Sequence, residues 1–471
     1  MRFTTPTSEI TDEFSKIVGA NYIFIDDENR YTYSHDKTED YSFLPDVVLK
    51  PGTAEEISKI LVICNEHKLP VTPRGGGTGL SGGALPVHHG VVISMERFNK
   101  ILEIDELNLQ ATVEPGVITQ VFQEAVIAKG LFYPPDPSSR GTCFIGGNLG
   151  ENAGGPKAVK YGVTRDYVLN MEVVLPTGEI IWTGANVLKN STGYNLTQLM
   201  VGSEGTLGII TKVVFKLRSY PQKDVTLLVP FSTSEEACKA ISAVYMVGIT
   251  PSGMEFMERE AIERTIHYLA DVMDSRVQID LPPNIQAHLL IELDGNDEGV
   301  LMKEAEIIME VLEKFEIGEV LFAETAQQKA ELWKLRRNVS PGVNAYSLTK
   351  AEDVVVPRGS LPELITGIKQ IGKAYGFNSV CYGHAGDGNL HINIMKENIS
   401  DEDWHTKVND GIAEIFKLVA QLKGTLSGEH GIGIAKRPYM HLVMPEVQLN
   451  LMRGIKKVFD PNGILNPDKI F

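Results

Sequence analysis

Short apolar segments rich in valine and isoleucine, each bounded by glycine or proline, recur along residues 45–220. The segments that this pattern predicts as strands are LPDVVLKP, LPVTPR, VVISM, ATVEPG, MEVVLP, EIIWTG and GIITKVVFKL. The segment TAEEISKILVICNEHK instead has the apolar spacing of a helix, with Thr53 as its N-cap and two glutamates in its first turn. The pattern therefore predicts a region of mixed strands and helices that glycine interrupts often.

The pattern changes from Val225 onward, where glycine becomes rare. VTLLVP, AHLLIEL and EVLFA have the composition of strands, and EEACKAISAVYMV and DEGVLMKEAEIIMEVLEKF have helical spacing. This alternation predicts a compact α+β or ferredoxin-like second domain. The tail FDPNGILNPDKIF indicates a turn and a closing segment. We expect three parts, residues 1–220, 221–424 and 425–471.

Composition limits the class of protein. A chain of 471 residues exceeds one compact core, and its formal net charge of -17 argues against a nucleic-acid or anionic-membrane partner. A small anionic substrate remains compatible with a local basic pocket. The four scattered cysteines suggest neither a disulfide framework nor an iron–sulfur site. With no secretory signal and no membrane-length apolar run, we expect a soluble, cytoplasmic protein.

The loop PRGGGTGLSGGALP, residues 73–86, raises the question of what so much glycine binds. Gly77, Gly79 and Gly82 match the dinucleotide motif G-x-G-x-x-G, and Glu96 follows at the distance of a ribose-binding acid. That motif needs a helix to begin inside it, whereas here Pro86 and a predicted strand follow. Six glycines between residues 75 and 83 instead indicate backbone packed against an anion, as in a pyrophosphate-binding loop of another type.

Two further glycine clusters, at residues 134–162 and 202–215, suggest an extended cofactor lying along the backbone. The order PRGGGTGLSGG, PPDPSS…IGGNLGENAGG…KYG and GSEGTLGI resembles the FAD-binding domain of the vanillyl-alcohol-oxidase-type flavoproteins. Within that superfamily the chain resembles the FAD-linked D-2-hydroxyacid dehydrogenases, from about Pro45 to the C-terminal GILNP. The resemblance implies an α+β fold in which a two-part FAD-binding domain precedes a ferredoxin-like substrate domain. It also implies a C-terminal segment that returns to the FAD domain and completes the active site.

The resemblance implies where FAD is bound. The pyrophosphate would lie on the first loop, and the flavin and ribityl chain on the second cluster; the adenine end would lie on the third. The residues so assigned are Arg74, Gly75, Gly76, Gly77, Thr78, Gly79, Ser81 and Gly82; Pro135, Asp136, Ser138, Gly147, Asn148, Asn152, Gly154, Gly155 and Tyr161; Glu204, Gly208 and Ile209; and Asn466. No histidine lies between Arg74 and Gly83, so we expect non-covalent FAD.

The segment CYGHAGDGNLHINI places His384 and His391 on either side of a tight turn, and LSGEHGIG adds Glu429 and His430. Two histidines and a carboxylate with one open position are typical of a catalytic zinc site, although turn histidines also serve as hydrogen-bonded structural residues. The resemblance implies that His384, His391 and Glu429 bind a divalent metal and that His430 is the catalytic base. Zinc is expected, with manganese as the alternative.

The segment LWKLRRNVSPGVNAYSLTK contains an arginine pair that could equally be a solvated helix face. The resemblance implies that Arg336 pairs with a substrate carboxylate, with Ser340 and Lys350 beside it, and leaves Arg337 as an alternative. A guanidinium donates two parallel hydrogen bonds to a carboxylate. Strand alternation places Asn393 on the face of His391, which makes it a further substrate donor.

Together these features predict an FAD-dependent dehydrogenase that oxidises a D-2-hydroxy acid to the 2-oxo acid. Its electrons would pass to a separate acceptor, an electron-transfer flavoprotein, an iron–sulfur subunit or a quinone, which could hold it at a membrane periphery; a homodimer is an open alternative. A partner-dependent FAD subunit of a glycolate or lactate oxidase complex is the second hypothesis. A zinc hydrolase would leave three glycine clusters unexplained. Lactate, glycolate and 2-hydroxyglutarate are not distinguished by sequence.

Overall fold

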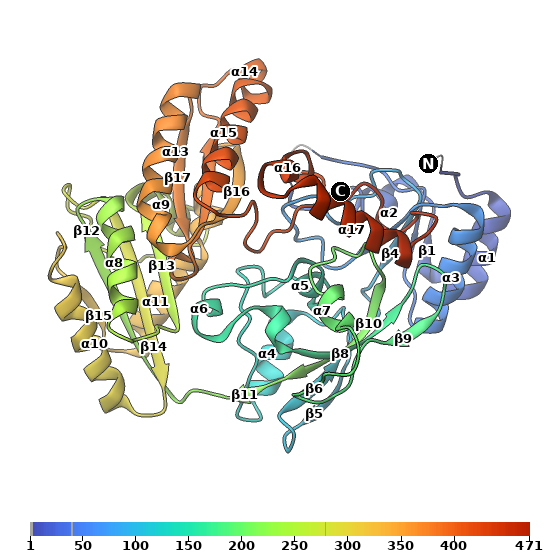
Figure 1. The fold of residues 1–471 in the computed structure, drawn as a ribbon, viewed down its shortest axis with the longest axis horizontal. Coiled ribbons are helices and arrows are strands. Elements are labelled where there is room, and N and C mark those ends of the chain that lie inside the picture. The colour runs from blue at the N-terminus through green and yellow to red at the C-terminus, as the bar shows by residue number, and fades with distance from the viewer. Residues whose placement is uncertain (1–2, 39–40, 278) are drawn as a thin grey trace. The chain divides into compact units, whose positions relative to one another are not determined.

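The structure is a computed structural model that describes residues 3–38, 41–277 and 279–471 (Figure 1). The chain divides into two compact units. Unit 1 combines Met1–Gly154, Gly162–Tyr220 and Glu429–Phe471, and unit 2 combines Gly155–Tyr161 and Pro221–Gly428. Each unit is therefore built from segments that are distant in the sequence.

Unit 1 contains sheets of four, five and two strands within the described residues. The first sheet has the order β1-β2-β4-β3, with β1 Ile23–Phe24, β2 Val47–Leu49, β3 Val71–Arg74 and β4 Val91–Ser94. The second has the order β5-β6-β10-β8-β9, with β5 Ile101–Asp105, β6 Gln110–Val113, β8 Val168–Val174, β9 Ile180–Trp182 and β10 Ile209–Lys216. The third pairs β7 Leu131–Phe132 with β11 Arg218–Ser219. Every strand that the hydrophobic pattern predicts between residues 45 and 220 is present.

Helices cover these sheets, and local sequence explains where they begin. Helix α3 Ala54–His67 starts as predicted, because the Thr53 side chain accepts a hydrogen bond from the amide of Glu56. Its buried residues pack with helix α1 Ser8–Val18 on strands β2 to β4. The other helices of unit 1 are α2 Asp27–Tyr31, α4 Thr119–Ile127, α5 Ile145–Glu151, α7 Leu196–Met200, α16 Met440–Val443 and α17 Glu446–Phe459, with 3-10 turns at Ala20–Tyr22, Thr164–Tyr167 and Arg437–Tyr439. Helices α5 and α17 are findings of the structure that the sequence pattern does not predict.

Unit 2 is built on one antiparallel sheet with the order β15-β12-β14-β13-β17-β18-β16. The strands are β12 Lys223–Phe231, β13 Gly253–Glu258, β14 Ala287–Gly295, β15 Leu321–Ala323, β16 Thr349–Val355, β17 Asn378–Gly383 and β18 Asn389–Met395. The predicted strands VTLLVP, AHLLIEL and EVLFA correspond to β12, β14 and β15. The helices are α6 Ala158–Tyr161, α8 Ser234–Met246, α9 Arg259–Asp271, α10 Glu298–Leu312, α11 Ala326–Arg337, α12 Val339–Asn344, α13 Leu361–Tyr375, α14 Asp401–His405 and α15 Lys407–Gln421, with 3-10 turns at Arg358–Ser360 and Ala385–Asp387.

The two faces of this sheet carry different chemistry. Strand pairing places Tyr382, His391 and Asp353 on one face, because directly opposed residues project to the same side. We call this side the His391 face; helices α9, α11 and α12 pack on it through one apolar cluster. Helices α8, α10 and α13 contact the sheet from its other side, and α15 packs on α13 (Figure 1). The polar residues on the His391 face are therefore enclosed between a sheet and its covering helices.

The four cysteines are free and buried. Among the described residues, every helix is too short or too polar to span a bilayer.

Candidate active site

The glycine loop in unit 1 runs between two parallel strands without forming a helix. Strand β3 ends at Arg74 and β4 begins at Val91, and the loop between them contains turns and bends only. Glu96 is committed elsewhere, since it pairs with Lys50 at 2.7 Å and accepts a hydrogen bond from the Tyr33 hydroxyl at 2.7 Å. The structure thus excludes the Rossmann interpretation of the G-x-G-x-x-G match.

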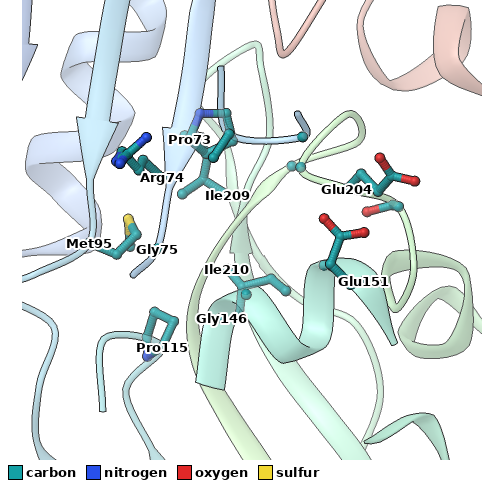
Figure 2. Close-up of a pocket in the computed structure, with 17 residues that line it drawn as sticks. Pro73, Arg74, Gly75, Met95, Pro115, Gly146, Glu151, Glu204, Ile209 and Ile210 are labelled. Atoms are coloured by element: carbon teal, nitrogen blue, oxygen red, sulfur yellow. The ribbon is translucent and has the colours of Figure 1, made fainter. Parts of the chain in front are cut away.

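A pocket in unit 1 brings parts of all three glycine clusters together (Figure 2). Its lining includes the predicted cofactor residues Arg74, Gly75, Gly147, Glu204, Gly208 and Ile209. Two features fit a flat, anionic cofactor. A Cβ placed on Gly147 would meet nothing within 4 Å, so backbone is open to a ligand there. The Nη1 atom of Arg74 is buried and has no hydrogen-bond partner among the described residues, as expected of a donor reserved for a phosphate.

Several other predicted cofactor side chains are engaged by protein groups. The Asp136 carboxylate pairs with Arg140 at 3.0 Å, and the Asn148 amide donates to Thr119 Oγ1 at 2.6 Å. Asn152 ends α5 in a left-handed conformation and accepts from the Arg165 amide at 2.9 Å. These contacts shape the backbone of the second cluster. Gly155 and Tyr161 lie in unit 2, where the Tyr161 hydroxyl donates to Asp294 at 2.8 Å.

The C-terminal segment is hydrogen-bonded to the glycine loop. Asn466 donates its side-chain amide to the carbonyl oxygens of Gly83 at 2.9 Å and Glu204 at 2.7 Å, and its backbone amide to Val71 at 2.7 Å. Ile434 likewise donates its amide to the Ser81 carbonyl at 2.9 Å. Asn466 therefore acts through the loop backbone. For Gly76, Gly77, Thr78, Gly79, Gly82, Pro135, Ser138 and Gly154, direct FAD contact stays a prediction.

Two carboxyl groups meet at one side of the pocket, and sequence reasoning identified only one of them (Figure 2). The Glu204 carboxylate accepts hydrogen bonds from the amides of Ile432 at 2.8 Å and Gly433 at 2.7 Å. The Oε2 atom of Glu151 is buried without a hydrogen-bond partner among the described residues. Burial, together with the neighbouring Glu204 charge, raises the pKa of Glu151 well above the usual range. Burial also raises the pKa of Glu204, which the two amides partly offset. Of the two carboxyl groups, Glu151 has the pKa that is raised further above the usual range. In the sequence it is recognisable as an acid between two glycine pairs.

Replacing Glu151 by Gln should make stability less dependent on pH. A carboxyl whose pKa is raised by folding stabilises the fold fully below its unfolded-state pKa, and that contribution is lost as pH rises through the folded-state pKa. Above about pH 4.5, the ordinary pKa of a glutamate, the wild type should therefore lose stability relative to Glu151→Gln, by up to about 1.4 kcal/mol per pH unit. Thermal unfolding of flavin-free protein across a pH series measures this. The exposed control Glu66→Gln should follow the wild type; a Glu151→Gln curve parallel to wild type would contradict the assignment.

In unit 2, a tight turn sets the spacing of the two motif histidines. His384 follows β17 and His391 lies in β18, and their rings stand 5.4 Å apart at 84°. Both side chains are buried. The turn closes at Gly388, whose φ of +79° is accessible to glycine, and a Cβ there would lie 2.0 Å from the Val356 carbonyl oxygen. The predicted tight turn between the histidines is thus present.

Gly388→Ala should therefore destabilise unit 2 and disturb both histidines. The left-handed conformation alone costs about 1–2 kcal/mol for alanine, and the collision with backbone adds to it. Gly376 is the matched control, because its φ is +78° and a Cβ there would meet nothing within 4 Å. Urea unfolding followed by tryptophan fluorescence should show a clearly larger loss for Gly388→Ala than for Gly376→Ala. Equal losses in the free energy of unfolding would mean that the backbone of the turn shifts to accommodate the added methyl group.

A carboxylate that sequence reasoning missed organises this face. Glu255 in β13 is fully buried; its oxygens lie 2.8–2.9 Å from His384 Nδ1, and Oε2 lies 2.6 Å from Arg336 Nη2. Burial would raise the pKa of Glu255, but the charges of Arg336 and His384 outweigh it and lower that pKa below its usual value. The feature that singles out Glu255 is that it is an acid inside a strand in which every residue is buried.

The donor atoms of this cluster suit a divalent metal. Since His384 uses Nδ1 toward Glu255, its Nε2 remains as the ligand atom, the usual pattern of a carboxylate behind a metal-binding histidine. The neighbouring Asp353 accepts hydrogen bonds from Ser427 Oγ and the Gly428 amide, both at 2.9 Å. Glu429 and His430 follow Gly428 directly in the chain. The two histidines are thus brought together, and the chain leading to Glu429 is tied to the strand beside His391.

Of the residues predicted to bind a substrate carboxylate, the structure brings only some to the His391 face. Arg336 is 3% exposed and lies at Glu255, whereas Arg337 lies over the Trp333 ring at 5.4 Å, which favours Arg336 as the clamp. Burial raises the pKa of Tyr382 on the His391 face, and the side chains of Ser340 and Asn393 partly offset that rise. Both polar side-chain atoms of Asn393 are buried without a hydrogen-bond partner among the described residues. Lys350 does not join them: its Nζ donates to the Trp404 carbonyl at 2.7 Å and Asn409 Oδ1 at 2.6 Å. The reason is register, since Lys350 pairs with Ile394 and so projects from the opposite face.

Comparison with known proteins supports the FAD assignment. Residues 45–184 match the FAD binding domain family, and residues 220–470 match the C-terminal domain of FAD linked oxidases. The chain is 40% identical to the glycolate oxidase subunit GlcD of Bacillus subtilis, over 99% of this chain and 97% of the relative. It is 37% identical to a D-lactate dehydrogenase of Anaerostipes hadrus, over 100% of this chain and 98% of the relative. It is 32% identical to a D-2-hydroxyglutarate dehydrogenase of Stutzerimonas stutzeri, over 98% of each.

Solved structures show the same fold. p-Cresol methylhydroxylase superposes with a TM-score of 0.80 at 19% identity, covering 99% of this chain and 97% of the other. This likeness confirms the predicted fold class.

Proposed function

The chain belongs to the FAD-linked oxidases, and we propose that it oxidises a D-2-hydroxy acid to the corresponding 2-oxo acid. The observation that carries this proposal is the buried cluster of Arg336, Glu255 and His384 beside His391 on one face of unit 2. Arg336 and His384 both contact Glu255, and this supports the binding of a substrate carboxylate next to a metal. The named activities of the relatives, on glycolate, D-lactate and D-2-hydroxyglutarate, support the same substrate class.

In this proposal each side chain has a separate task. Arg336 binds the carboxylate next to the reacting carbon, and Asn393 donates to the same substrate. His384, His391 and Glu429 would hold a divalent cation, zinc or manganese, which when bound would lower the pKa of an alcohol. His430 removes the hydroxyl proton, a task suited to imidazole. Non-covalently bound FAD supplies the hydride-accepting chemistry.

The reduced protein must pass two electrons to an acceptor. We propose a separate protein acceptor or a quinone, because a glycolate oxidase relative is named as a subunit. The same name supports a second candidate, an FAD subunit with little activity outside its complex. Assembly with a second copy of the chain is tested by measuring the mass in solution.

Anaerobic bleaching of the flavin tests the proposal. Purified protein loaded with metal is mixed with D- and L-2-hydroxy acids, and flavin absorbance is followed. Rapid bleaching by a D-acid, abolished by EDTA and restored by zinc or manganese, is the expected result. A bound flavin that no hydroxy acid reduces, with or without metal, would exclude autonomous activity and favour the subunit hypothesis.

A further inference from the structure

Glu151 is a carboxyl group in the cofactor pocket of unit 1 to which the sequence analysis assigns no role. It is the last residue of helix α5, and it lines the pocket together with Gly83 and Glu204 (Figure 2). Its Oε2 atom is buried and has no hydrogen-bond partner among the described residues. Because buried polar atoms are almost always hydrogen-bonded, such an atom in a ligand pocket indicates a contact that the ligand supplies.

The carboxyl groups of Glu151 and Glu204 border the same small space. A Cβ placed on Gly431 would lie 1.8 Å from Glu151 Oε2 and 3.1 Å from Glu204 Oε1. Glu204 is the better suited of the two to carry a negative charge, because the amides of Ile432 and Gly433 donate to its two oxygens. A second negative charge on Glu151 would be repelled by the first.

The surroundings of Glu151 disfavour its ionised form. Burial raises the pKa of Glu151 most, the charges of Glu204 and Asp36 raise it further, and Lys436 opposes them. Lys469, a further buried cation, acts on Glu204. The pyrophosphate of FAD brings two more negative charges to this pocket, so bound cofactor disfavours a carboxylate at Glu151 still more.

We infer that Glu151 binds FAD as a neutral carboxylic acid, donating a hydrogen bond to the cofactor. A carboxylate only accepts hydrogen bonds, whereas a protonated carboxyl group also donates one. Proteins use buried carboxylic acids as neutral donors in this way. FAD binding is therefore coupled to the uptake of a proton by Glu151, and the affinity for FAD falls as the pH rises. This inference concerns cofactor binding and does not depend on the proposed oxidation of a hydroxy acid.

The first test measures the dissociation constant of FAD across a pH series with the flavin-free, metal-free wild type. Folding raises the pKa of Glu151 above its ordinary value, and bound FAD should raise it again. Below the first of these two pKa values the carboxyl group is protonated with and without FAD, so Kd should be constant. Between them Kd should increase by up to about tenfold per pH unit, because binding takes up one proton. Calorimetry in buffers of different ionisation enthalpy should detect that proton directly.

The second test changes the residue itself. Glu151→Gln keeps a hydrogen-bond donor that does not titrate, and Glu151→Met has a similar length without a donor. Glu151→Gln should bind FAD about as tightly as the wild type does at low pH, with no pH dependence and no proton uptake. Glu151→Met should bind FAD about tenfold more weakly or worse at low pH, because a hydrogen bond to the cofactor is lost. The exposed control Glu66→Gln should keep the wild-type pH profile.

Two results would overturn the inference. One is a wild-type affinity for FAD that does not change with pH. The other is a pH dependence that persists in Glu151→Gln, which would assign the proton to another group, such as Glu429 or His430 in the loop that leads to Gly431. If the variants fail to fold, proton uptake by the wild type decides, since its absence would overturn the inference as well.

Discussion

Replacing Glu255 by Gln should destabilise unit 2 by about 3–5 kcal/mol, the cost of leaving one partner of a buried ion pair without its counter-charge. Arg336 would be the stranded partner, because its side chain is 4% exposed and pairs with Glu255 at 2.6 Å. The glutamine amide oxygen can still accept from His384, so the loss reports mainly on the arginine. Where His384 holds a metal, the weaker support should also lower metal affinity by about 10–100-fold.

Urea unfolding followed by tryptophan emission measures this loss, since Trp333 and Trp404 both lie in unit 2. Glu263→Gln is the matched control: it removes the same charge from a half-exposed pair with Arg259 and should cost less than about 1 kcal/mol. The double variant Glu255→Gln with Arg336→Met should recover most of the stability, because neither member of this buried ion pair keeps its charge. It should not recover oxidation of a hydroxy acid, because the carboxylate clamp is gone. Equal stability of Glu255→Gln and wild type would show that Arg336 finds another counter-charge.

Much of the cofactor region could be predicted from sequence because its constraints are local. Strands bounded by glycine, a threonine N-cap and a loop that lacks the Rossmann helix can each be recognised within a short stretch of sequence. The motif order then identified the family that the comparisons show. Helix α5 escaped prediction because Gly146, Gly147 and Gly150 lower helix propensity, and its packing within unit 1 overrides that preference.

The substrate face could be predicted less well, because its geometry depends on long-range pairing. Glu255 and His384 are separated by 129 positions in the chain, and β13 and β17 bring them together. Lys350 shows the same dependence on long-range pairing, because it was predicted to lie at the site and projects from the other face of the sheet. A one-residue shift along a strand moves a side chain to the other face, and the register of β16 is set by β18, about forty residues away. Residue type suggested a clamp, but only the register shows which side chains face His391.

His430→Asn should lower kcat for hydroxy-acid oxidation by about 10²–10⁴-fold, the usual contribution of a general base, with flavin content unchanged. Asparagine keeps a polar side chain but does not take up the hydroxyl proton. Glu204 supports the loop that follows His430, through the amides of Ile432 and Gly433, so the substitution leaves that support intact.

Single-turnover flavin bleaching at saturating D-acid isolates this step from electron transfer to the acceptor. His405→Asn is the control, since His405 is an exposed histidine of α14, and it should bleach at the wild-type rate. Metal content measured in the same samples separates the two roles of this segment: loss of metal together with activity would make His430 a ligand. Retained metal with slow bleaching would make it the base, and wild-type bleaching would exclude it from both.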